Sequence, residues 1–87
     1  NAAMHDPIIL VSPLPVGGWS VRLQGSEANQ VFADRYCALE YAHVWAQDAR
    51  PSRVCLMDAN GGIEDECTYG KFQERRAQPP LLAVATN

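Results

Sequence analysis

The sequence predicts an α+β domain of two layers, in which one helix packs on one face of a four-stranded, mainly antiparallel sheet. Two observations predict this fold. Over residues 18–70 the apolar pattern changes from alternation to a helical period and back to alternation, and turn-forming residues separate the alternating runs. The element order read from this pattern is β-β-α-β-β. Residues 1–17 and 71–87 are then expected to be N-terminal and C-terminal extensions of that domain.

The first two strands are predicted over residues 18–24 and 29–33. The first carries Trp19, Val21 and Leu23 at alternate positions with polar residues between them, so one face is buried and the other open. A turn-rich segment follows and leads into the short second strand.

The helix is predicted over residues 35–49. Asp34 is suited to be its N-cap, because an aspartate side chain accepts from the free amides of the first turn. One stripe of the helix is apolar and consists of Ala38, Leu39, Ala42, Trp45, Ala46 and Ala49. The opposite face carries Tyr36, Glu40, His43 and Gln47. Arg50-Pro51 ends the helix, since proline disfavours helical geometry in the residue before it.

The last two strands are predicted over residues 52–58 and 62–69, joined at Asn60-Gly61 by a two-residue type I′ turn. This register directs Val54, Leu56, Ile63, Cys67 and Tyr69 toward the helix. It directs Arg53, Cys55, Met57, Glu64 and Glu66 to the other face.

The three cysteines are Cys37, Cys55 and Cys67, and their spacing matches no metal site. The favoured register places Cys67 opposite Val54 and Cys55 beside Glu66, so the last two cysteines point to opposite faces. A register one residue longer would pair them, but it would also set an apolar residue beside a glutamate. We therefore expect no disulfide and a reducing cytoplasm.

Both ends of the chain contain short apolar runs, Ile8–Val11 and Leu81–Ala85, each next to prolines. A single helix covers only one side of a sheet, so these runs are expected to cover the open face, to add an edge strand, or to reach into a second copy. This reasoning predicts a homodimer. The candidate interaction residues are Ile8, Ile9, Leu10, Val11, Cys55, Met57, Leu81, Leu82 and Val84.

Length and charge restrict the function classes. A chain of 87 residues suits one small domain, and a formal net charge of −3 with a pI near 5.1 is atypical of a protein that binds a phosphate backbone. No apolar run approaches the roughly 20 residues of a membrane span, and no secretory signal is recognised. Asn1–Ala3 precede Met4 and have the composition of a cloning remnant, which would make Met4 the native start.

The chemistry-bearing residues have ordinary structural interpretations. Asp58, Glu64, Asp65 and Glu66 lack the spacing of a calcium loop and are typical of a solvated hairpin rim. No catalytic residue, cofactor site or metal ligand is assigned. The leading hypothesis is a non-enzymatic protein-interaction module. The alternatives are a small hydrolase or redox enzyme using His43 or Cys55, and a weak nucleic-acid binder using Arg22, Arg53, Arg75 and Arg76.

A set of spaced core and turn residues carries a resemblance to a known family. The set is Trp19-x-Val21, Phe32, Ala38-Leu39-x-x-Ala42, Val54, Gly61-x-Ile63 and Tyr69-Gly70. Over about residues 18–70 the chain resembles the short bacterial proteins of domain-of-unknown-function family 2188. The resemblance implies a β-β-α-β-β fold and a bacterial cytosolic setting, and it implies no activity.

Overall fold

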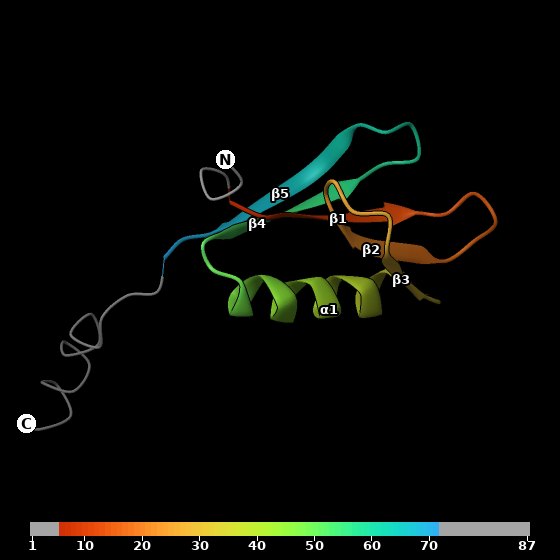
Figure 1. Ribbon diagram of the computed structural model, residues 1–87. Coiled ribbons are helices and arrows are strands. Elements are labelled where there is room, and N and C mark those ends of the chain that lie inside the picture. The colour runs from red at the N-terminus through yellow and green to blue at the C-terminus, as the bar shows by residue number, and fades with distance from the viewer. Residues whose placement is uncertain (1–5, 72–87) are drawn as a thin grey trace, which may run out of the picture.

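The computed structural model describes residues 6–71, which form a five-stranded mixed sheet with one helix against one face (Figure 1). In chain order the elements are β1 (Ile8–Pro13), β2 (Trp19–Leu23), β3 (Asn29–Phe32), α1 (Arg35–Asp48), β4 (Ser52–Met57) and β5 (Ile63–Tyr69). The α+β class and the single helix are confirmed. The sheet differs from the expectation in having a fifth strand and one parallel pair. No helix within residues 6–71 has the length and apolar character needed to cross a membrane.

The fifth strand is β1, and it occupies the middle of the sheet. The strand order is β3-β2-β1-β4-β5, with β1 antiparallel to β2 and parallel to β4. The expectation that Ile8–Val11 covers the open face, adds an edge strand or reaches another copy is therefore wrong. Ile9 and Val11 are fully buried in the core, whereas Leu10 lies on the other face with only 8% exposure. A strand buried on both faces needs no alternation, which explains its continuous apolar run.

Helix α1 begins and ends as its sequence predicts. The Asp34 carboxylate accepts from the Cys37 backbone N–H at 2.8 Å and so satisfies one free donor of the first turn. At the other end the Ala49 N–H donates to two carbonyls of the last turn. The buried Ser52 hydroxyl donates to the Ala46 carbonyl at 2.7 Å, which connects the end of α1 to the start of β4.

The core lies between α1 and the middle of the sheet. Helix α1 packs on β1, β2 and β4 and touches β3, whereas β5 lies beyond its main contacts. Alanines form the buried stripe of α1, and their small side chains allow the helix backbone to approach the sheet closely. The buried core residues are Ile9, Val11, Val21, Ala38, Ala42, Ala46, Val54, Leu56 and Tyr69.

The β4–β5 hairpin has the predicted register along most of its length. Val54 pairs with Cys67 and Cys55 with Glu66, so the two cysteines lie on opposite faces and all three cysteines are free. The predicted type I′ turn is wrong, because only Gly61 has a positive φ there, at 87°. The Gly61 N–H instead donates to the Asp58 carbonyl, as in a type I turn followed by a left-handed glycine. A bulge beside Leu56 and Met57 then restores the register.

The sheet face away from α1 is partly closed to solvent. Leu10 and Cys55 pair across β1 and β4 on this face, and Cys55 is only 4% exposed. Figure 1 shows the β2–β3 loop rising on this side of the sheet, and Arg22 Nη1 donates to the Ser26 carbonyl of that loop at 3.3 Å. Arg53 Nε forms an ion pair with Glu66 at 3.1 Å beside Cys55.

Candidate interaction surfaces

The first candidate surface is built on β3, which is an edge strand. Its residues Asn29–Phe32 pair with β2 on one side only, and none of them is charged. Val31 is 61% exposed, whereas Phe32 packs against the core on the helix side. An uncharged edge strand leaves backbone donors and acceptors available for another strand.

The flank of α1 beside β3 is apolar and aromatic. Tyr41 and Val44 are 40% and 56% exposed, and Trp45 is half-buried. The ring centroids of Phe32 and Tyr41 lie 5.1 Å apart and those of Tyr41 and Trp45 lie 6.0 Å apart. We call this set of residues the β3 patch; it comprises Phe32, Tyr41, Val44 and Trp45 on the helix side, together with Val31, which points to the other face of the edge strand.

Tyr41 and Val44 were not expected on any interaction surface. The signal was present, because Tyr41, Val44 and Trp45 occupy positions i, i+3 and i+4 of the helix and so share one flank. This flank adjoins the apolar stripe, of which only Ala38, Ala42 and Ala46 are fully buried. Trp45 therefore lies at the border of the core rather than in its middle.

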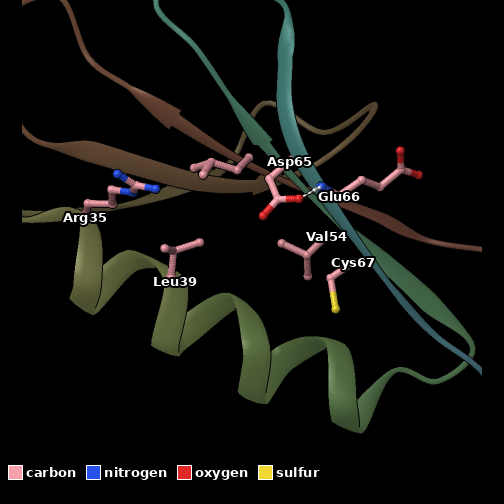
Figure 2. Close-up of a pocket in the computed structure, with 7 residues that line it drawn as sticks. Arg35, Leu39, Val54, Asp65, Glu66 and Cys67 are labelled. Carbon is pink, nitrogen blue, oxygen red and sulfur yellow. Dashed lines mark hydrogen bonds between the residues drawn. The ribbon is translucent and has the colours of Figure 1, made fainter.

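The second candidate surface is a groove between α1 and β5. It has an apolar floor that includes Leu39, Val54 and Leu56. Figure 2 shows the remaining lining, with Arg35 at one end and Asp65, Glu66 and Cys67 along the β5 side. The groove exists because α1 lies over β1, β2 and β4 and leaves β5 uncovered.

A polar cluster joins the C-terminal half of α1 to the end of β5. His43 Nδ1 lies 2.6 Å from the Tyr69 hydroxyl, and the Gln47 side-chain amide nitrogen lies 2.9 Å from His43 Nε2. Because an amide nitrogen only donates, His43 Nε2 accepts and the neutral ring carries its proton on Nδ1. Arg50 lies over the Tyr69 ring at 5.5 Å and donates to the Gly70 carbonyl. Both ring nitrogens of His43 are thus engaged.

Two thiols have pKa values above the ordinary 9.0. Burial is the main cause for Cys55, the nearby Glu66 carboxylate adds to it, and Arg53 opposes it. For Cys37 the main cause of the raised pKa is its contact with Asp34, whose carboxylate oxygen lies 3.7 Å from Sγ. Since the thiolate is the nucleophilic form, both residues are held in the unreactive thiol form near neutral pH.

The expected interaction residues are distributed over different parts of the molecule. Ile9 and Val11 are core residues, and Leu10 and Cys55 are buried on the far face; Ile8 and Met57 are half-buried there. The C-terminal candidates Leu81, Leu82 and Val84 lie outside the described residues, as do Arg75 and Arg76. Within residues 6–71 no three potential ligands come together in a group that could hold a metal ion.

Over residues 6–71 the fold and these surfaces define a small α+β protein, with one helix on one face of the sheet and unpaired edges at β3 and β5. The family model of an uncharacterised protein conserved in bacteria, DUF2188, matches residues 9–69, and the chain belongs to this family. The match confirms the resemblance and extends it to include β1. Neither the curated proteins nor the solved structures give a significant match to this chain.

Proposed function

We propose that this chain is a non-enzymatic protein-interaction module and that it acts as a homodimer through the β3 patch. The observation that carries the proposal is the combination of an uncharged, unpaired β3 edge with exposed Val31, Tyr41 and Val44 beside it. Aromatic residues are enriched and charged residues are depleted in the centres of protein interfaces. Two β3 strands pairing antiparallel across a two-fold axis would extend the sheet and set the two α1 flanks side by side.

Charge favours the β3 edge over the β5 edge for contact between identical copies. Strand β5 carries Glu64, Asp65 and Glu66, so two β5 strands would bring acidic residues together. Charged residues on an edge strand oppose self-pairing. Strand β3 has no such protection.

The two alternatives, a small hydrolase or redox enzyme and a weak nucleic-acid binder, receive less support. The raised pKa of Cys55 and its burial keep that thiol protonated and inaccessible. His43 is hydrogen-bonded at both ring nitrogens and has no nucleophile among its bonded partners other than the Tyr69 hydroxyl. The two described arginines of the proposed nucleic-acid surface are already bonded within the chain. Arg22 donates to the Ser26 carbonyl, and Arg53 forms an ion pair with Glu66. Three free cysteines suit a reducing compartment, so we propose a location in the bacterial cytoplasm.

The test is the oligomeric state of the full chain, measured by size-exclusion chromatography with light scattering over a range of concentrations. The unmodified protein is expected to be a dimer, and Val31→Lys and Val44→Lys are expected to be monomers. Val16→Lys is the matched control, because Val16 is 94% exposed in the β1–β2 loop and lies outside the β3 patch. Circular dichroism checks that each variant folds.

Two results would overturn the proposal. One is an unmodified chain that stays monomeric at every concentration. The other is a dimer that survives both patch substitutions but disappears when residues 72–87 are removed, since the contact would then run through the C-terminal segment.

A further inference from the structure

The outer edge of β5 lies on the opposite side of the sheet from the β3 patch. Strand β5 ends the sheet order and pairs with β4 on one side only. The Glu66 backbone N–H is bound by the Asp65 carboxylate of the same strand at 2.9 Å, which Figure 2 marks with a dashed line. That N–H therefore points away from β4, and by alternation the Thr68 N–H does so too. A carboxylate bonded to an edge N–H hinders pairing with other strands in general. A strand that binds this edge specifically can still displace the carboxylate.

The groove between α1 and β5 adjoins this edge on the helix side. Its floor of Leu39, Val54 and Leu56 is apolar, and Cys67 and Asp65 of β5 form the wall next to the free edge. A strand added outside β5 would continue the sheet and direct every second side chain to the helix side, next to this groove. The groove is more open than enclosed, so it suits the side chains of an extended segment better than a whole small molecule.

The charge of the edge selects the occupant. Glu64, Asp65 and Glu66 are all exposed on β5, and of these three only Glu66 forms an ion pair within residues 6–71, with Arg53 at 3.1 Å. A second copy would present the same acidic strand and be repelled. A segment with alternating basic and apolar residues would neutralise the acids and also supply apolar side chains.

We propose that the β5 edge, with the groove beside α1, binds an extended segment of another protein in which lysine or arginine alternates with apolar residues. The segment pairs with the outward main-chain groups at Glu66 and Thr68 and displaces the Asp65 carboxylate from the Glu66 N–H. Its basic side chains lie against the acidic residues of β5.

The probe is a fluorescently labelled peptide of sequence Lys-Val-Lys-Val-Lys-Val-Lys, titrated with the full chain and followed by fluorescence anisotropy. Two peptides of the same length are controls. In one, glutamate replaces every lysine; in the other, proline replaces the central valine, which keeps the charge but breaks the strand. The first peptide is expected to bind with shifts of the β5 amide resonances of residues 64–68, and neither control is expected to bind comparably.

Variants of the protein test the contribution of charge and the contribution of main-chain hydrogen bonds to peptide binding separately. Glu64→Lys should weaken binding of the lysine peptide about fivefold or more, whereas Glu40→Lys, on α1, should leave it unchanged. Thr68→Pro removes an outward N–H that β4 does not use and should abolish binding. If Thr68→Pro unfolds, the peptide that carries proline provides the same comparison on the unmodified chain.

Equal binding of the valine and proline peptides would show simple charge attraction and overturn the proposal, as would resonance shifts that leave β5 unaffected. The Val31→Lys variant distinguishes this proposal from the homodimer proposal. It should lose dimerisation and still bind the lysine peptide with the affinity of the unmodified chain.

Discussion

His43 of α1 and Tyr69 of β5 meet through a 2.6 Å hydrogen bond, although α1 otherwise leaves β5 largely uncovered. Tyr69 is the one buried residue of its strand, and its ring also packs near Arg50. This contact fixes the end of the edge strand against the helix. The remaining residues of β5 stay exposed and lie beside the groove.

Tyr69→Phe removes this hydrogen bond and should lower the free energy of unfolding by about 0.5–1.5 kcal/mol, measured by urea denaturation. Tyr36→Phe is the control, because Tyr36 is exposed and the same change there should stay within about 0.5 kcal/mol. Equal effects of the two substitutions would contradict a structural role for the His43–Tyr69 contact.

The raised pKa of Tyr69 predicts that the free energy of unfolding falls at alkaline pH. Burial is the main cause that raises the pKa of Tyr69 above its ordinary 10.0, Cys67 adds to it, and Arg50 opposes it. A raised folded-state pKa gives a stabilisation that is complete below about pH 10 and is lost as the pH rises through the folded-state value. The stability difference between the unmodified chain and Tyr69→Phe should therefore be constant below pH 10 and diminish above it. A constant difference at all alkaline pH values would contradict the assignment.

Ala42 lies at the middle of the close contact between α1 and the sheet and is fully buried. Ala42→Leu should lower the free energy of unfolding by about 1–3 kcal/mol, because the larger side chain forces the helix away from the strands. The control is Ala59→Leu in the exposed hairpin turn, which should change it by less than about 0.5 kcal/mol. Thermal unfolding of the three proteins checks the order.

Gly17 and Gly18 both have positive φ angles, 103° and 89°, but differ in their surroundings. A Cβ at Gly18 would lie 3.0 Å from the Phe32 carbonyl oxygen, whereas a Cβ at Gly17 would meet nothing within 4 Å. Gly17→Ala should cost about 1–2 kcal/mol from backbone strain alone. Gly18→Ala should cost more, because β3 must also shift, and comparison of the two denaturation midpoints tests this.

The Asp34 carboxylate has two effects, as N-cap and as the main cause of the raised Cys37 pKa. Asp34→Asn keeps a good N-cap but removes the charge, so the melting temperature should change little while the Cys37 pKa falls. Alkylation of Cys37 by iodoacetamide at pH 8 should become faster, and mass spectrometry of the modified peptides measures the rate. An unchanged rate would show that the carboxylate does not control this thiol.

The sequence predicted α1 and its cap, because both follow from local periodicity and a short-range contact. The register of Val54 against Cys67 was also correct, although the turn from which it was derived was not, because the bulge beside Leu56 and Met57 offsets the change of turn. The sequence did not predict the central place of β1. The apolar run at Ile8–Val11 fits a strand buried on both faces, but only pairing with β4, more than 40 residues later, makes it one. The turn at Gly61 was mistaken because the Asp58 carboxylate, which accepts from the Asn60 and Gly62 N–H groups, favours a different turn type.

The β3 patch was missed for a related reason. A helical stripe indicates which residues can face a sheet, but not how far the helix is displaced across it. Tyr41 and Val44 are exposed because β3 is the outermost described strand on that side of the sheet, so no further strand covers this flank of α1. The interaction role of this surface stays a prediction.

The position of β1 has a consequence for how the molecule can be shortened. Among the strands of residues 6–71, β2 and β3 are hydrogen-bonded to β4 and β5 only by way of β1. A cleavage or a late translation start that deletes Ile8–Pro13 would leave two separate hairpins on opposite sides of the helix, with the core residues that β1 covers exposed. Such a fragment would retain most of the amino acids of the domain and yet have no continuous sheet.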